Sequence, residues 1–566
     1  METKNAERKK YRMAMPKGKW LEPEEAFEGL FGRIPDNCRT AMVATFVAGL
    51  ITHMFFLVNK LPNGDDLSEL YHYNSMITSG RWLDIVSKGM TSYYSLPWAS
   101  GLVCLVLMGI SVALICSLAG LKRKPEIIAA AAIFATFPTM ASYFSYLYYM
   151  DLYMLTLLFN VWAVWLAWRK TWGFIPGALL IALGLGNYQA YMGVAAVLSL
   201  FVLARECLGG EKSIKRIVIV GLRLLIMGMI GLALYFFILQ GIVSYLSLDL
   251  SDYQGIAGMG TGAMDASAIW RYTRDAYGGF TSFFYNDRFF TSPMVVKCIY
   301  SLLLVLTFLW ILVALYRRFR QGGRAESAGR ILLFFLFAGV LPVAYNLIFF
   351  MAPDAFLHSL MQPQYALFWL MPMMFYELAY PAKDAVKHGA AKQGALRQGA
   401  SGSAGKVSWF QGITRWLLLG SLAGLVYFFF LTVNISYLHL HLKYEITYAT
   451  ELRILDRIES LPDYQTDTPV CVVGAFPNEY VSLYPYHTQD VVKGLVGING
   501  NLVHHYYNYN GFFKNYLGRQ MNFLREDDER KADILTWPEV EGMPVWPREG
   551  SVSMINGVVI VKIDTP

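Results

Sequence analysis

Long apolar segments separated by short basic clusters recur along most of this chain of 566 residues. The chain is 55% hydrophobic and 16% charged, whereas soluble domains carry about 25% charged residues. Most of the apolar segments approach the length of about 20 residues that an α-helix needs to cross a bilayer. The pattern therefore predicts a polytopic membrane protein, and it limits the fold more than any other feature of the sequence.

About eleven segments meet the length criterion, and together they predict a mainly α transmembrane helical bundle over residues 40–434. In chain order the expected spans are 40–58, 97–120, 127–143, 152–168, 173–186, 190–204, 217–248, 295–316, 331–351, 365–380 and 416–433. The pair at 173–186 and 190–204 is short for membrane spans, so its boundaries are the least well defined. Ionisable groups concentrate near the ends of the spans, and no internal repeat links the two halves of the bundle.

The basic clusters define an orientation through the positive-inside rule. If the N-terminal segment 1–39 is cytoplasmic, every basic cluster falls on the cytoplasmic side. These clusters are residues 122–124, 169–170, 212–216, 317–324 and the low-complexity linker 383–415. The loops at 59–96 and 249–292 are then outside. The net charge of +7 comes with these clusters rather than with a basic face, so no nucleic-acid partner is expected.

Residues 435–566 differ from the apolar region and predict a small extracytoplasmic α/β domain. The stretch 447–460 is helical and amphipathic, and 501–517 is a second expected helix. Two short apolar runs, 470–474 and 557–562, have the composition of β-strands. An odd number of spans places this domain on the side opposite to the N-terminus.

Two adjacent carboxylates, Asp65 and Asp66, directly follow the first span. Asn63-Gly64 indicates a turn, and the following LSELYHYNSMI has helical spacing. Asp66 with Glu69 matches a D-x-x-E capping pattern at the start of that expected helix. Asp65 has no such structural explanation, so we assign it as the candidate general base, with Asp66 as alternate or partner. Together they are also the candidate ligands of a divalent cation such as Mg²⁺ or Mn²⁺.

Three arginines of the outer loops are candidate ligands for a phosphate. Arg81 lies in Gly80-Arg81-Trp82, and its planar guanidinium suits bidentate phosphate binding as well as interfacial anchoring. Arg271 and Arg274 flank a tyrosine in the second outer loop. Salt bridges to Asp265 or Asp275 are the alternative for these two.

Further polar groups fall at the same membrane level and predict a shared substrate cavity. Asp151 begins the fourth span, where the helix dipole also favours a carboxylate. The remaining candidates are Asn187, Gln189, Tyr191, His358 and Gln364. Each group alone is a weak signal, but groups at one depth can line one cavity and bind sugar hydroxyls.

The sequences NGDDLSELY at 63–71 and SGRW at 79–82, with the topology described above, resemble the bacterial serotype-converting O-antigen glucosyltransferases. GLGNYQAY at 184–191 adds support. In topology the resemblance covers most of the chain. This family belongs to the GT-C class of polyprenyl-phosphate-sugar-dependent glycosyltransferases, whose members carry an essential carboxylate in the first outer loop.

The resemblance implies an inverting transfer of a sugar from a polyprenyl-phosphate donor to a hydroxyl of a cell-envelope glycan. Glucose is the expected sugar, although no motif identifies it. It places Asp65 or Asp66 as base and Arg81 or Arg271 near the departing phosphate. It further implies the bacterial cytoplasmic membrane, a C-terminal domain that helps to hold the acceptor, and a separate flippase and polyprenyl-phosphate-sugar synthase. A transporter or flippase of lipid-linked sugars is the alternative function.

Overall fold

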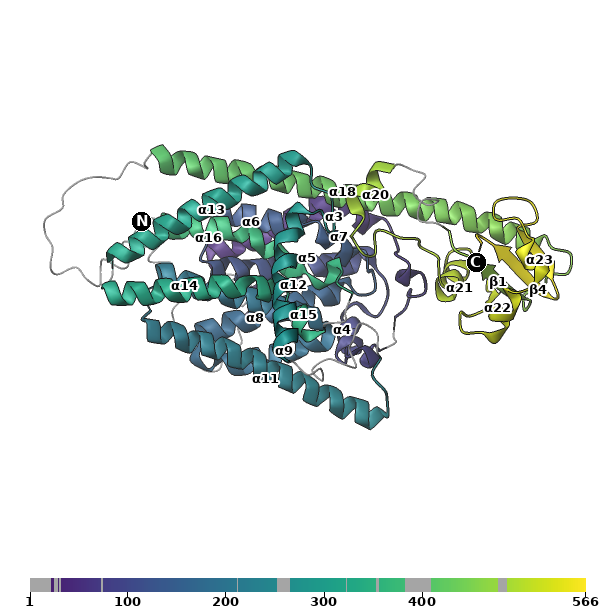
Figure 1. Ribbon diagram of the computed structural model, residues 1–566, viewed down its shortest axis with the longest axis horizontal. Helices are drawn as coiled ribbons and strands as arrows, with labels where there is room; N and C mark the ends of the chain where they lie inside the picture. The colour runs from purple at the N-terminus through teal and green to yellow at the C-terminus, as the bar shows by residue number, and fades with distance from the viewer. Residues whose placement is uncertain are drawn as a thin grey trace.

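The computed structural model describes residues 22–565, apart from residues 25–28, 30–31, 73–74, 211, 252–264, 322, 353–355, 382–408 and 477–485. Most of the expected N-terminal segment 1–39 and of the linker 383–415 lies outside the described residues. The chain forms a polytopic helical bundle with a small sheet domain at one end (Figure 1). The predicted fold class is therefore confirmed.

Eight helices of the described chain are long and apolar enough to cross a membrane. They are α3 (Asp36–Val58), α5 (Pro97–Ala119), α8 (Met150–Arg169), α10 (Met192–Gly209), α11 (Ile214–Leu246), α13 (Met294–Gln321), α14 (Arg324–Tyr345) and α18 (Trp409–Glu459). The other three predicted spans correspond to the shorter helices α6 (Lys124–Thr136), α9 (Phe174–Asn187) and α16 (Leu370–Ala379). α6 ends before Pro138, where α7 (Thr139–Phe144) begins, because a proline disrupts the hydrogen bonding of a helix interior.

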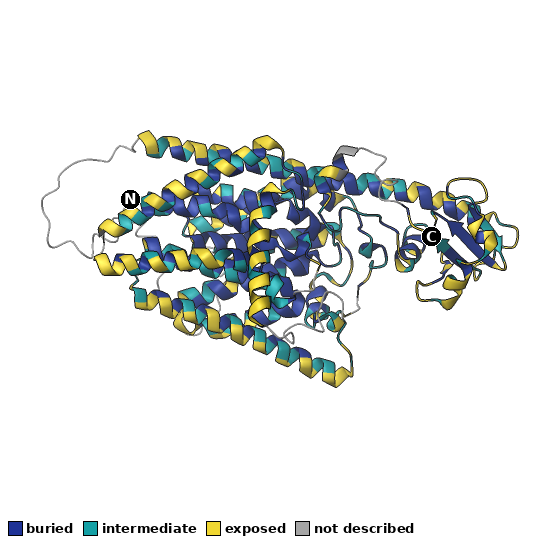
Figure 2. Ribbon diagram, in the orientation of Figure 1, coloured by how far each residue is buried: buried dark blue, intermediate teal, exposed yellow. Residues whose placement is uncertain are grey.

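The outer surface of the bundle is apolar, as a bilayer requires. Side chains such as Phe237, Leu332 and Met229 are 79%, 72% and 63% exposed. In Figure 2 the buried residues concentrate in the middle of the bundle, and exposed residues line the outward faces of α11, α13 and α14. Since exposed apolar side chains are stable in lipid and costly in water, this arrangement supports the assignment as a membrane protein.

Basic side chains join the helix ends at one end of the bundle. Arg123 pairs with Glu377 at 2.6 Å and links the start of α6 to α16. Arg415 of α18 donates two bonds to the buried Glu126 carboxylate, at 2.9 and 3.2 Å. Arg205 donates to the Ser117 carbonyl at 3.2 Å, which lies in the last turn of α5, where carbonyls lack helical partners. Charged groups that were expected on the cytoplasmic side therefore meet at one end.

The second outer region contains a long helix rather than an irregular loop. α12 (Ala266–Tyr285) runs across the spanning helices instead of along them (Figure 1). It is fastened to the end of α14 by Asn346, whose Nδ2 donates to the Ala276 carbonyl at 2.8 Å. Beyond α14 the chain continues through the short α15 (Ile348–Met351) and two 3-10 helices, Ser359–Met361 and Pro363–Trp369, into α16.

The C-terminal domain is built on the far end of α18, which is continuous over 51 residues. The last span and the amphipathic stretch 447–460 therefore form one helix. The sheet has the order β2-β1-β4-β3, with β1 parallel to β2 and β4, and β3 antiparallel to β4. The strands are β1 (Pro469–Val473), β2 (Asn522–Phe523), β3 (Val552–Ile555) and β4 (Val558–Lys562), and the helices are α20 (Tyr486–Val492), α21 (Tyr506–Asn515), α22 (Glu529–Ile534) and α23 (Pro538–Glu541).

The prediction of a helix directly after Asp65 is wrong. Only a 3-10 turn, Asp65–Leu67, forms there, and the next helical turn is Ile77–Ser79. The intervening backbone bonds instead to a distant part of the same loop: the His72 N–H donates to the Tyr93 carbonyl at 2.8 Å, and the Ser95 N–H donates to the Leu70 carbonyl at 3.1 Å. This extended pairing, completed by α4 (Asp84–Lys88), replaces the local helix that the spacing suggested.

The Glu126–Arg415 pair predicts a measurable contribution to stability. Glu126→Ala leaves the guanidinium without its two acceptors, so we expect the free energy of unfolding to fall by about 1–3 kcal/mol. Thermal unfolding in detergent micelles measures the change. Glu459→Gln is the control, because Glu459 and Arg519 are 41% and 60% exposed and such surface pairs contribute about 0–1 kcal/mol. Equal shifts for the two variants would contradict the assignment.

Candidate functional site

Asp66 is buried and fixes the turn of the first outer loop. Its carboxylate accepts the Asn63 N–H at 3.0 Å, and its own N–H donates to the Asn63 side chain at 2.9 Å. The other carboxylate oxygen accepts the Tyr148 N–H at 3.3 Å, which ties the loop to the turn before α8. The predicted capping role of Asp66 is wrong, because no helix follows this residue in the described part of the loop and its carboxylate bonds back to Asn63. Glu69 contacts His72 instead.

A cavity of about 250 Å³ opens beside this turn, and Asp65 lies on its wall. The charged and polar part of the lining consists of Asp65, Arg81, Gln189, His358 and several tyrosine side chains. The remaining lining residues are apolar. The full lining is Asp65, Met76, Arg81, Tyr146, Tyr148, Tyr153, Tyr188, Gln189, Ala190, Ile348, Ala352, Phe356, His358, Leu360, Met361 and Val496. Four of the predicted site residues therefore meet in one cavity.

Arg81 is the cation of this cavity wall. Its guanidinium lies over the rings of Tyr188 and Tyr149, with centroid distances of 4.7 and 5.4 Å. One nitrogen donates to the Met76 sulfur at 3.3 Å. Within the described part of the chain it forms no ion pair with a carboxylate. A guanidinium supported by aromatic rings and left without an acidic partner is well suited to bind an anion.

A buried ion pair holds the Arg81 turn in place. Lys88 and Asp84 are 2.9 Å apart, and their side chains are 1% and 0% exposed. Asp84 also accepts the Met76 N–H at 3.1 Å, and the Met76 carbonyl accepts the Arg81 N–H at 3.1 Å. The sequence analysis missed this pair, although its i,i+4 spacing was visible.

Gln189 and His358 are the predicted sugar-binding residues that reach the cavity. Gln189 Nε2 donates to the Ser79 carbonyl and to the Tyr235 hydroxyl, both at 3.0 Å. His358 enters from the segment after α15. Burial first, and then the charge of Arg81, lowers the pKa of His358 to about 4, so its ring is neutral at pH 7.

Asn187, Tyr191 and Gln364 lie behind the cavity wall rather than on it. Asn187 Oδ1 accepts from Ser87 at 2.9 Å. Tyr191 is fully buried, and its ring stacks on the Tyr153 ring at 6.2 Å. Gln364 Nε2 donates at 2.6 Å to a backbone carbonyl at the end of α14. These three side chains shape the wall without facing the space inside it.

Asp151, Arg271 and Arg274 also lie outside the cavity lining. Asp151 is buried and accepts from Thr91 at 2.5 Å and from the Leu152 N–H at 3.0 Å, as its helix N-terminal position allows. Arg274 pairs with Asp275 on the exposed face of α12 at 3.2 Å. Arg271 is exposed and lies over the Tyr272 ring. Arg274 therefore forms the alternative salt bridge, whereas Arg271 contacts Tyr272 and forms no ion pair with a described carboxylate.

Burial and nearby charges act in opposite directions on Asp65. Burial raises the pKa of Asp65, while the charges of His505 and Arg81 lower it, and the balance lies above the usual aspartate value. Burial also raises the pKa of Asp66, against the backbone N–H groups of Asn63 and Tyr148 that favour its charged form. Asp65 is thus a carboxylate with an upward-shifted pKa on a cavity wall, as a general base requires.

The residues present do not fit a divalent cation bridged by Asp65 and Asp66. Both Asp66 oxygens already accept backbone N–H groups. The described residues contain no group of three or more His, Cys, Asp or Glu side chains that could hold a metal ion.

The sequence analysis did not identify the tyrosines that form much of the polar wall. Tyr146, Tyr148 and Tyr153 come from the turn before α8 and its first residues. Their signal in the sequence is the aromatic run directly before Asp151. Val496 was not foreseen either, and it brings the C-terminal domain into the cavity wall.

Comparison with known proteins identifies the chain. A family model described as "Glucosyl transferase GtrII" matches residues 54–376. The match begins in α3, ends in α16 and contains Asp65, Arg81 and the rest of the cavity lining except Val496. No curated protein and no solved structure matches the chain. Because the model covers more than half of the chain, this membrane protein belongs to the glucosyl transferase GtrII family, the family that the resemblance indicated.

Proposed function

We propose that the protein transfers glucose from a polyprenyl-phosphate donor to a hydroxyl of a cell-envelope glycan, with inversion at the anomeric carbon. The observation that carries this proposal is the cavity, whose lining brings together a carboxylate, Asp65, and a cation, Arg81, that forms no ion pair with a described carboxylate. Apolar side chains complete the lining. This combination suits a substrate with a sugar, a phosphate and a hydrocarbon chain.

Arg81 is the proposed ligand of the donor phosphate. The bond that breaks joins the anomeric carbon to a phosphate oxygen. Its electron pair stays on that oxygen, so the departing polyprenyl phosphate gains negative charge. A fixed guanidinium stabilises that charge without reorganisation. Ile348, Leu360 and Met361 are apolar side chains of the cavity lining and are the proposed contacts of the first isoprene units.

Asp65 is the proposed base. It takes the proton of the acceptor hydroxyl while that oxygen bonds to the anomeric carbon from the face opposite to the phosphate. Attack from the opposite face inverts the configuration of that carbon. The upward shift of the Asp65 pKa brings the base closer to the pH at which it works, which favours proton transfer.

Gln189, neutral His358 and the tyrosines of the wall are the proposed contacts of the glucose hydroxyls. Amide, imidazole and phenol groups both donate and accept hydrogen bonds, as a sugar with several hydroxyls requires. The aromatic faces of Tyr148 and Tyr188 add apolar contact for the sugar ring. Asn187, Tyr191 and Gln364 keep this wall in place.

The basic end of the bundle is the proposed cytoplasmic face, by the positive-inside rule. The cavity and the C-terminal domain then lie on the extracytoplasmic side of a bacterial cytoplasmic membrane. In this orientation the donor is made by a separate polyprenyl-phosphate-sugar synthase and brought across by a separate flippase. The acceptor glycan reaches Asp65 from the extracytoplasmic side.

Substitution of the two aspartates tests the base. Asp65→Asn cannot take a proton, so we expect transfer to fall by about 10²–10⁴-fold with donor binding retained. Asp66→Asn keeps one acceptor oxygen, and we expect it to be destabilised by about 1–3 kcal/mol yet to retain measurable transfer. Transfer from radiolabelled polyprenyl-phosphate glucose measures both, with Asp275→Asn on exposed α12 as control. Full activity of Asp65→Asn would disprove its role as base.

Substitution of arginines tests the phosphate site. Arg81→Gln removes the cation of the cavity, so we expect a higher KM for the donor and a kcat reduced on the order of 10²–10³-fold. Arg271→Gln and Arg274→Gln remove exposed cations outside the cavity and are expected to behave like the wild type. Steady-state kinetics with varied donor distinguishes the two sites. Loss of activity in the α12 variants alone would place the phosphate there instead.

The pH dependence follows from the pKa of Asp65. The base acts when it is deprotonated, so activity rises with pH through this pKa. Since that pKa lies above the ordinary value of 3.8, the acid limb of kcat/KM is expected at higher pH than for an exposed aspartate. His505→Gln removes a positive neighbour that lowers this pKa, and should move the limb further upward. An acid limb of kcat/KM at the pH of an ordinary aspartate, with no change in His505→Gln, would contradict the assignment of this limb to Asp65.

A further inference from the structure

The helix α21 of the C-terminal domain lies directly on the loop that carries Asp65. Asn508 Nδ2 donates to the Gly64 carbonyl at 2.8 Å, and Asn515 Nδ2 donates to the Leu67 carbonyl at 2.8 Å. Ser68 Oγ donates to the Tyr507 carbonyl at 3.0 Å. The bonded residues flank Asp65 on both sides along the chain, so α21 bonds to the loop before and after it.

The contact face of α21 is a stripe of three residues, Asn508, Gly511 and Asn515. Positions i, i+3 and i+7 lie on one face of an α-helix. At Gly511 a Cβ atom would lie only 2.8 Å from backbone atoms of Leu67 and Ser68. The glycine thus allows the backbones of helix and loop to approach closely, and the two asparagines reach the loop on either side of it.

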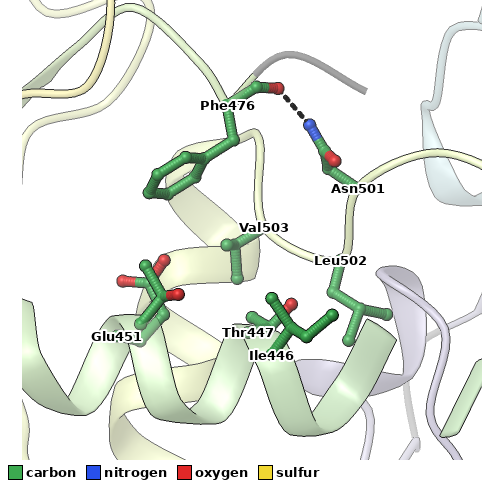
Figure 3. A pocket seen from close by; sticks show the side chains of 8 residues that line it. Ile446, Thr447, Glu451, Phe476, Asn501, Leu502 and Val503 are labelled. Atoms are coloured by element: carbon green, nitrogen blue, oxygen red, sulfur yellow. Dashed lines mark hydrogen bonds between the residues drawn. The ribbon is translucent and has the colours of Figure 1, made fainter. Parts of the chain in front are cut away.

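α21 is itself anchored to α18. The segment from Asn501 to Val503 leads toward α21 and packs over α18 around Glu451 (Figure 3). Asn501 donates a hydrogen bond to the Phe476 carbonyl, and Lys443 of α18 donates to the Ile498 carbonyl at 2.5 Å. Since α18 is one continuous helix, it connects the membrane bundle to the helix that holds the loop.

We propose that α21 is a positioning element for the transfer reaction, with Asn508 and Asn515 as positioning residues and Gly511 as the position that permits the contact. Asp66 holds the turn from the bundle side, through Asn63 and Tyr148. The α21 stripe holds it from the outer side. Between these two attachments the Asp65 side chain has a fixed position on the cavity wall. The catalytic part of this inference rests on the proposed role of Asp65.

Gly511→Ala is the sharpest variant, because it separates positioning from stability. Alanine favours a helix over glycine by about 1 kcal/mol, so α21 itself does not lose helical preference, but the added methyl group must displace the loop backbone. Gly420→Ala is the matched control, since a Cβ there has nothing within 4 Å.

Asn508→Ala and Asn515→Ala complete the set. Their control is Asn522→Ala, which removes a side-chain hydrogen bond of 2.8 Å to the Asp467 carbonyl, away from the Asp65 loop.

Three measurements on the full-length protein test the proposal. Amide hydrogen exchange in residues 64–68 is expected to accelerate in the α21 variants. kcat is expected to fall by on the order of 10- to 10²-fold, with the donor KM unchanged. Loosening the contact lets water reach Asp65, so the acid limb of the pH profile should move to lower pH. A purely structural role would reduce the amount of folded enzyme without moving this limb.

The outcomes distinguish the two proposals. Wild-type exchange, kcat and pH profile in Gly511→Ala and the two asparagine variants, with Asp65→Asn inactive, would overturn the role of α21 and leave Asp65 as the base. Full activity in Asp65→Asn would overturn the base. In that case the exchange data still test the contact of α21 with the loop. Unchanged exchange of residues 64–68 in the α21 variants would show that α21 does not hold the loop, and accelerated exchange would show that it does.

Discussion

The site depends on the buried carboxylate of Asp66, which accepts backbone N–H groups from Asn63 in its own loop and from Tyr148 in the turn before α8. A buried carboxylate is stable only when hydrogen bonds replace its water, so these hydrogen bonds fix the conformation of the turn around Asp66. It places the neighbouring Asp65 against the tyrosines that follow α7, and therefore on the same cavity wall as Arg81. This attachment therefore fixes the Asp65 turn of the first outer loop beside the same cavity as the Arg81 turn of that loop.

The distribution of charge separates the two ends of the bundle. At one end arginines and glutamates neutralise each other and complete the hydrogen bonding of helix ends, as Arg123 with Glu377 and Arg415 with Glu126 do. At the other end Arg81 lies over aromatic rings without an acidic partner in the described chain. Since a charge near lipid is costly, an unpaired guanidinium there is best explained by an anionic substrate. The GtrII match, which ends before α18, includes both ends of the bundle.

The sequence was informative where a local pattern determines the outcome. Span positions followed from apolar length. Asp65 was predicted from the acidic pair after the first span, and Arg81 from its suitability for phosphate. Gln189 and His358 were predicted because polar groups at one membrane depth tend to converge. The helix after Asp65 was predicted wrongly because pairing of residues 70–72 with residues 93–95 outweighs local spacing. Arg271 was a candidate beside Arg81 because the sequence does not show that α12 contributes no residue to the cavity lining. The bond from Asn508 to Gly64 spans 444 positions, a separation that no local pattern reveals.

The most direct test of the account is a structure of the protein with a polyprenyl-phosphate glucose bound. We expect the phosphate on the Arg81 guanidinium, the anomeric carbon on the side of Asp65, and the first isoprene units against Ile348, Leu360 and Met361. Density for the phosphate at Arg271 and Arg274, with the cavity beside Asp65 empty, would contradict it.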